Sequence, residues 1–223
     1  TEQTNSKFLS ISNDGFTVLK GVLADLASNA IQKILSAVAA LGKGIVNLGK
    51  QSLQNFANYE QLAGGVETLF GKSADIVKEY ANNAYKTSGL GANQYLETVT
   101  GFSASLLQSL GGDTKKAAEI SDMAIVDMSD NANKMGTSME SITDAYKGFA
   151  KQNYQMLDNL KLGYAGSKTE MERLLKDAEK LSGKKYDIKN LNDVYQAIHV
   201  IQQEMGITGT TAVEAEKTIS GSI

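Results

Sequence analysis

Residues 14–56 read DGFTVLKGVLADLASNAIQKILSAVAALGKGIVNLGKQSLQNF, 43 residues without a proline. Apolar residues recur in them at steps of 4, 3, 4, 4, 3, 4, 4 and 3, close on average to the 3.6 residues of a helical turn. This apolar stripe consists of Leu19, Leu23, Leu26, Ala30, Ile34, Ala37, Leu41, Ile45 and Leu48. The spacing predicts one long amphipathic helix of about 65 Å, longer than a compact domain of this size needs.

The apolar stripe predicts a helix that packs lengthwise against partner helices. Its average step exceeds the 3.5 residues of a heptad, so the apolar residues stay on one side of a nearly straight rod. The pattern alone does not fix the number of helices in the assembly. The most apolar part, residues 30–46, is interrupted by Gln32, Lys33 and Lys43, which makes it too short and too polar for a membrane span.

Composition predicts an all-α protein. The chain of 223 residues has no proline, no cysteine and no tryptophan, and only six phenylalanines. Nothing therefore interrupts the helices, and the large aromatic content of a β-sandwich core is missing. We expect a flexible lead-in at 1–13, a long oligomerising helix at 14–58 and a compact helical domain at 59–223. Its expected helices lie near 59–70, 73–86, 92–110, 113–134, 138–155, 168–182, 190–205 and 211–220.

Net charge, cysteine content and the two ends of the sequence limit the functions that the chain can have. The net charge of −3 comes from 22 basic and 25 acidic residues, which argues against specific binding of nucleic acid through a basic face. Absence of cysteine excludes disulfides and thiol catalysis. The first residues do not form a signal peptide, and neither end resembles a natural terminus, so we expect a section of a longer protein or a processed product.

Helix starts are marked by capping boxes, in which a hydroxyl and a carboxyl satisfy exposed amides reciprocally. The pairs are Ser167 with Glu170, Thr211 with Glu214 and Thr137 with Glu140, and Asn190 with Asp193 is a weaker analogue. These pairs predict helices that begin directly after each hydroxyl or amide residue.

Two polar features invite a chemical interpretation and favour a structural one. His199 is the only histidine, and without cysteine or a nearby pair of carboxylates it predicts neither a zinc site nor a catalytic triad. The run that begins at Asp127 has the alternating oxygens of a calcium loop, but Ala132 replaces the glycine and Ser138 replaces the bidentate glutamate. We interpret this run as a polar helix end whose apolar residues partly turn inward.

Two further motifs also fail as sites. Gly89 and Gly91 resemble part of a dinucleotide fingerprint, but the third glycine is absent and no strand precedes them, so a turn between helices is the better interpretation. Carboxylates for glycoside cleavage would have to come from one helix, 168–182, and cannot flank a sugar bond from two sides. The sequence therefore indicates no catalytic residue, no metal ligand and no cofactor-binding residue, and we expect no enzyme activity.

The segment AYKGFAKQNYQMLDNLKLGYAGSKTEMERLLKDAEKL, residues 145–181, resembles the N-terminal portion of tail tape measure proteins from phages and prophages of Gram-positive bacteria. Four other blocks are similar to the same family in the same order. They are YEQLAGGVETLFG (59–71) and the blocks at 80–113, 122–142 and 206–223. The resemblance covers about three quarters of the chain, from Tyr59 to the end; the arm before it fits the family by its helical pattern only.

The resemblance implies a structural virion protein, made in the host cytoplasm and located in the lumen of the tail tube. Such proteins are mostly helical, oligomerise with a trimer as the family expectation, help set tail length and leave the tube when DNA is ejected. The implied partners are copies of the chain itself, the tail tube protein, distal tail or baseplate hub proteins, and tail assembly chaperones. No cofactor is implied.

Two alternative functions remain open from the sequence. One is membrane action after ejection, in which residues 16–46 would insert into or lie on the host envelope as part of a conduit for DNA. The sparse lysines and the absence of tryptophan speak against an interfacial helix. The other is a tail module associated with a cell-wall hydrolase, because some members of the family carry such domains elsewhere in their long chains.

Overall fold

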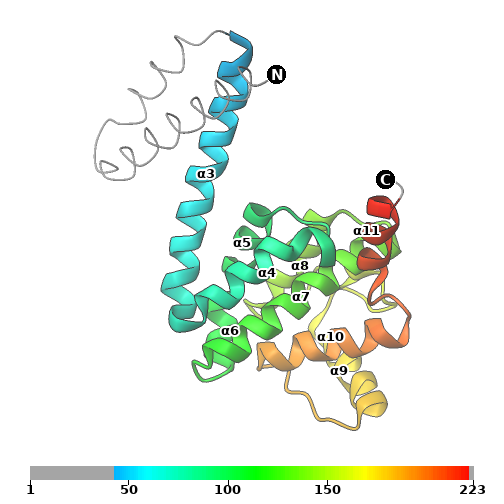
Figure 1. The fold of residues 1–223 in the computed structure, drawn as a ribbon. Helices are drawn as coiled ribbons and strands as arrows, with labels where there is room; N and C mark the ends of the chain where they lie inside the picture. The colour runs from blue at the N-terminus through cyan, green and yellow to red at the C-terminus, as the bar shows by residue number, and fades with distance from the viewer. Residues whose placement is uncertain (1–42, 221–223) are drawn as a thin grey trace. The chain divides into compact units, whose positions relative to one another are not determined.

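The computed structural model describes residues 43–220, and these form helices joined by turns and loops (Figure 1). The predicted all-α class is confirmed for this part of the chain, which contains no strand. Most of the predicted helix at 14–58 lies outside the described residues. The chain divides into two units between Ala57 and Asn58, and the unit Asn58–Ile223 is described below by itself.

The helices follow one another with short connections. Their bounds are α3 (Lys43–Phe70), η1 (Gly71–Ser73), α4 (Ala74–Thr87), α5 (Ala92–Thr100), α6 (Ser103–Ser109), α7 (Thr114–Met135), α8 (Met139–Phe149), η2 (Leu157–Leu160), α9 (Lys168–Ser182), α10 (Leu191–Glu204) and α11 (Thr210–Ser220). The helix expected at 59–70 is the end of α3, which is continuous from Lys43.

Helix α7 is the central element of the unit. It packs against α4, α5, α6, α8, α10 and α11, while α9 packs on α10 (Figure 1). The side chain of Asp113 accepts a hydrogen bond from the amide of Lys116 and so caps its first turn. Gly136 ends the helix in the left-handed conformation, with φ of 65°. Because α7 has neighbours on several sides, much of its surface is buried. Several of its polar residues are therefore buried as well.

One aromatic cluster occupies the centre of the core. Tyr146, Tyr195, Phe102 and Phe149 are all almost completely buried. The ring of Tyr195 meets Phe102 edge to face at a centroid distance of 5.5 Å and Tyr146 at 5.1 Å. These rings join α6, α8 and α10, three helices that are distant in sequence.

The helix expected at 92–110 is wrong, because the structure has two helices there. The chain leaves the helical path at Gly101, whose amide bonds to the carbonyl of Thr98 instead of continuing the ladder. A Cβ atom at Gly101 would lie 2.6 Å from the end of the Lys147 side chain, so glycine leaves room for that side chain here. The break turns Phe102 into the core, and burial of this aromatic ring compensates for the interrupted helix.

The helix expected at 138–155 is too long by six residues, because α8 ends at Phe149. The next residues turn back on the helix, with Gln152 at φ of 57° and the amide of Asn153 bonded to the carbonyl of Gly148. The cap of this helix is Ser138, one residue after the expected Thr137.

The cap predicted for α9 is confirmed. Ser167 Oγ accepts a hydrogen bond from the amide of Glu170 at 3.2 Å, and the Glu170 carboxylate accepts one from the amide of Ala165 at 3.1 Å. The glutamate thus satisfies an amide two residues before the cap instead of the cap's own amide. Serine and glutamate together fix both the start of α9 and the loop that leads into it.

We expect Ser167→Ala to lower the free energy of unfolding by about 1 kcal/mol, because the amide of Glu170 loses its acceptor. Urea denaturation measures the change. Thr169→Ala on the exposed side of the same first turn is the matched control and should leave stability nearly unchanged. Equal losses in both variants would contradict the capping role of Ser167.

Candidate functional site

The predicted oligomerisation stripe lies largely outside the described residues. Leu19, Leu23, Leu26, Ala30, Ile34, Ala37 and Leu41 precede the first described residue. Ile45 and Leu48 lie on α3, where only the backbone is described. The stripe therefore stays a prediction, and candidate sites on the folded unit have to come from its polar side chains.

The most unusual polar feature is a set of four polar residues along α7, three of them buried and the fourth, Asn133, exposed. We call Asp127, Asp130, Asn131 and Asn133 the polar seam. The first three are almost completely buried, with exposed fractions of 1%, 0% and 0%. Ile125 and Met128 of the same run are buried too, as the sequence suggested, but the inward orientation of the charged side chains was not predicted. Buried polar groups require partners, and each of these residues has one in a distant segment.

Asp127 binds the only histidine of the chain. His199 Nδ1 lies 2.9 Å from both carboxylate oxygens of Asp127, so the pair joins α7 to α10, and the imidazole side chain is 23% exposed. The hydrogen bond with Asp127 raises the pKa of His199, while burial opposes this effect. Burial raises the pKa of Asp127, and the hydrogen bond with His199 only partly offsets it. The sequence indicated no nearby pair of carboxylates for His199, and it did not predict Asp127, 72 positions away, as its partner.

Asn131 and Gln202 extend the connection between α7 and α10. The Asn131 amide donates to Gln202 Oε1 at 2.7 Å and to the carbonyl of Leu160 at 3.0 Å. Gln202 Nε2 in turn donates to the backbone carbonyl of Asp127 at 3.3 Å. Side chains and backbone of α7, α10 and η2 are thus joined by hydrogen bonds inside the core.

Asp130 holds the start of the C-terminal helix α11. Its Oδ2 accepts the amide hydrogen of Gly209 at 2.6 Å, and its Oδ1 accepts that of Thr211 at 2.8 Å. Asn133 Nδ2 donates to Thr211 Oγ1 at 2.9 Å. A carboxylate at a helix N-terminus is favoured by the free amides and the helix dipole. The sequence predicted a local capping box at Thr211, whereas the structure places the carboxylate of Asp130, 81 residues away, against its amide.

We expect Asp130→Asn to lower the free energy of unfolding by about 2 kcal/mol, because an amide offers one acceptor where two backbone donors converge. Chemical denaturation monitored by circular dichroism provides the measurement. Asp144→Asn, an exposed position on α8, is the control for loss of a negative charge. If the two variants were equally stable, the paired amide bonds would contribute nothing.

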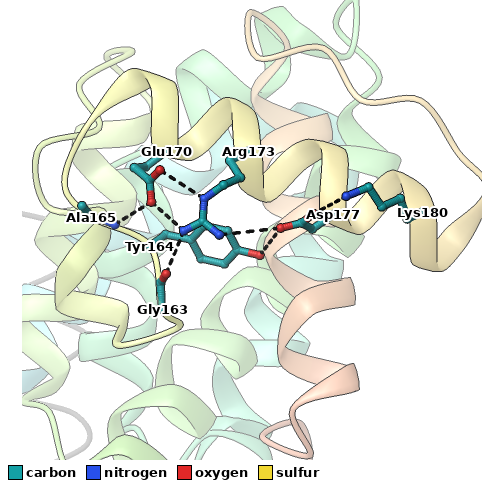
Figure 2. A network of polar contacts seen from close by, with 7 residues as sticks. All are labelled: Gly163, Tyr164, Ala165, Glu170, Arg173, Asp177 and Lys180. Atoms are coloured by element: carbon teal, nitrogen blue, oxygen red, sulfur yellow. Dashed lines mark hydrogen bonds and ion pairs between the residues drawn. The ribbon is translucent and has the colours of Figure 1, made fainter.

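A second polar network lies on the outer side of α9 (Figure 2). The guanidinium of Arg173 stacks over the ring of Tyr164 at 4.3 Å and donates to the carbonyl of Gly163 at 2.8 Å. It also makes two hydrogen bonds to the Glu170 carboxylate, at 3.1 and 2.6 Å. Asp177 accepts from Tyr164 Oη at 3.0 Å on the far side of the ring. Arg173 therefore pins the loop before α9 to the helix.

The pKa values of this network are shifted by its own members. Hydrogen bonding to Arg173 lowers the pKa of Glu170, and the hydrogen bond from Lys180 lowers the pKa of Asp177. Burial raises the pKa of Tyr164 to about 12, supported by its bond to Asp177. Carboxylates held in their charged form by neighbours on one helix stabilise the loop; they do not provide the acid of an acid–base pair.

The remaining sequence motifs lie in a turn and within a helix. Gly89, at φ of 67°, and Gly91, which precedes the first residue of α5, lie in the turn between α4 and α5. The alternating oxygens that begin at Asp127 are part of the continuous helix α7. Across residues 43–220 the structure contains no group of three or more side chains suited to hold a metal ion.

No helix within the described residues has the length and apolar character that a membrane crossing requires. Comparisons with known proteins found no matching family model, no matching curated protein and no matching solved structure.

Proposed function

We propose that the chain is a structural section of a phage or prophage tail tape measure protein. The main support for the proposal is that the region of resemblance and the compact unit begin at almost the same residue. The region that resembles this family begins at Tyr59, and the compact unit of the structure begins at Asn58. The five blocks occur in a fixed order and lie in one unit with a single apolar core. We expect this arrangement of a domain of that family.

The character of the folded unit supports a structural role. The buried carboxylates of Asp127 and Asp130 bind groups of α10 and of the start of α11, and the network around Arg173 holds a loop. We propose that the long helix at 14–58 associates through the apolar stripe into a trimeric rod inside the tail tube. In this proposal the chain contacts the tube protein and the hub, assists in setting tail length and leaves with DNA ejection, and it has no enzyme activity.

The proposed location is tested on particles induced from the bacterium that encodes the protein. Quantitative mass spectrometry should detect peptides of residues 58–223 in purified tails at a few copies per particle. After DNA ejection is triggered, the same peptides should be depleted from the tails while the tube protein remains. Absence of the chain from intact particles would refute the proposal.

The proposed association is tested by sedimentation equilibrium of the purified chain at micromolar concentration. We expect an oligomer, with Leu23→Asp and Ile34→Asp shifting it to monomer because a charge on the stripe opposes helix packing. Gln32→Glu, on the other side of the predicted helix, is the matched control. A monomer in the unsubstituted chain would remove the rod from the proposal.

Two assays separate the alternative functions. Flotation of the chain with liposomes of neutral and anionic lipids should show no association; binding that requires residues 16–46 would favour the membrane-active alternative. A zymogram with bacterial cell walls should show no clearing, and clearing would favour a hydrolase.

A further inference from the structure

The single histidine of the chain joins α10 to α7 through Asp127. His199 is the only histidine, and the chain has no cysteine. No other side chain has an ordinary pKa between pH 6 and 8.5. His199 is therefore the side chain whose ordinary pKa places its titration in this range. Its partner Asp127 lies one helical turn from Asp130, which holds α11.

Charge balance makes the polar seam sensitive to one proton. Asp127 and Asp130 are buried on the same face of α7, and the charge of each acts on the other and on His199. With His199 protonated, its positive charge compensates for one of the two carboxylates. When His199 is neutral, Nδ1 still donates to Asp127, but two negative charges share a poorly hydrated site. Repulsion between buried like charges is much stronger than in water.

The other polar groups around the pair come from α7, α8 and α10. The charged groups that act on His199 are Asp127 and Asp130, both from α7. From α8, the phenol of Tyr146 is influenced by the Asp127 charge, and burial raises the pKa of Tyr146 well above its ordinary value. Tyr146 therefore stays neutral, and from α10 Gln202 contributes only an amide.

Helix α11, which packs on α7 and α4, has few buried side chains among residues 210–217. Beyond Thr211, its residues 212–214, 216 and 217 are exposed and Ala215 is half-buried. Its first turn is attached to α7 by the two bonds from Asp130 and the one from Asn133. Gly206 and Gly209, at φ of 66° and 86°, lie in the connection that leads to it. By contrast, α10 buries Val194, Tyr195, Ala197, Ile198 and Ile201 in the core.

We propose that His199 and Asp127 form a proton-dependent clasp, in which loss of the proton from His199 releases residues 209–220 from α7 and α4 while the apolar core, which includes Ile207, stays folded. The carboxylate of Asp130 then gains water, which relieves the repulsion from Asp127. Release at α11 is favoured because little apolar surface has to be exposed. The clasp does not depend on the proposed tail function, since it rests on contacts of the folded unit.

The test combines two measurements on the full chain. NMR of the one histidine ring gives the pH range over which His199 loses its proton. Amide hydrogen exchange is then measured on both sides of that range, as protection factors corrected for the intrinsic effect of pH. We expect protection of residues 212–220 to fall at least about tenfold when the ring becomes neutral, which corresponds to about 1.4 kcal/mol. Protection in α7 and α10 should stay within a factor of about two.

His199→Gln and Asp127→Asn provide the decisive comparison. Glutamine cannot be protonated and asparagine removes one buried charge, so neither variant should show the change in α11 protection with pH. Asp144→Asn, exposed on α8, should behave as the unsubstituted chain. The proposal is overturned if α11 protection is unchanged while the ring titrates, if His199→Gln keeps the pH dependence, or if all helices lose protection together.

Discussion

Tyr195→Ala is expected to lower the free energy of unfolding by about 4 kcal/mol, the range observed when a large aromatic residue is removed from a core. The ring of Tyr195 is completely buried and contacts Phe102 and Tyr146. Its hydroxyl donates to the carbonyl of Tyr146 at 3.0 Å. Truncation removes all of these contacts and leaves a cavity where α6, α8 and α10 meet. Urea denaturation followed by circular dichroism measures the change.

Two phenylalanine variants separate ring packing from hydrogen bonding. Tyr195→Phe keeps the ring and loses the bond to the Tyr146 carbonyl, so we expect a loss of about 1 kcal/mol. The Tyr146 hydroxyl is buried and has no hydrogen-bond partner among the described residues, so Tyr146→Phe should leave stability unchanged or improve it. A larger loss in Tyr146→Phe than in Tyr195→Phe would contradict this assignment of the core contacts.

Gly166→Ala is expected to cost about 3 kcal/mol, because overpacking forces a shift of the backbone. A Cβ atom at Gly166 would lie 2.0 Å from the carbonyl oxygen of Gln155, so the two loop segments before α9 would have to separate. Separation would also disturb the cap at Ser167 and the bond from the amide of Ala165 to Glu170. The midpoint of thermal unfolding should fall correspondingly.

The matched control is Gly64→Ala, in the helical α3, where an added Cβ meets nothing within 4 Å. Alanine is favoured over glycine in a helix, so this variant should gain up to about 1 kcal/mol. If both alanine variants were neutral, the loop at Gly166 would have room that the structure does not show.

Sequence patterns predicted the helices wherever the signals were local. The start of α9 follows from Ser167 and Glu170, and its end from Gly183 at φ of 69°. The break at Gly101 could not be predicted in the same way, since the burial of Phe102 against Tyr195 compensates for it. Tertiary contacts of this kind override the local helix preference.

The polar seam shows the same limit for the candidate site. Asp127 and His199 are separated by 72 positions, and nothing near either residue indicates the other. The available signal was periodicity. Asp127, Asp130 and Asn131 continue the helical face that carries the buried Ala124, so polar residues on that face must find partners inside. Which partners they find depends on how α10 and α11 cross α7, and that is a property of the complete fold.

The polar seam also determines the axial alignment of α10 on α7. Apolar side chains on facing helices can exchange one neighbour for another when a helix slides by a turn, at modest loss. Such a slide would separate Asp127 from His199 and Asn131 from Gln202, leaving a buried charge and a buried amide unpaired. Breaking a buried pair costs about 3 to 5 kcal/mol, more than the sliding of the apolar residues. The core provides the attraction between these helices, and the seam selects a single register from those that the core would accept.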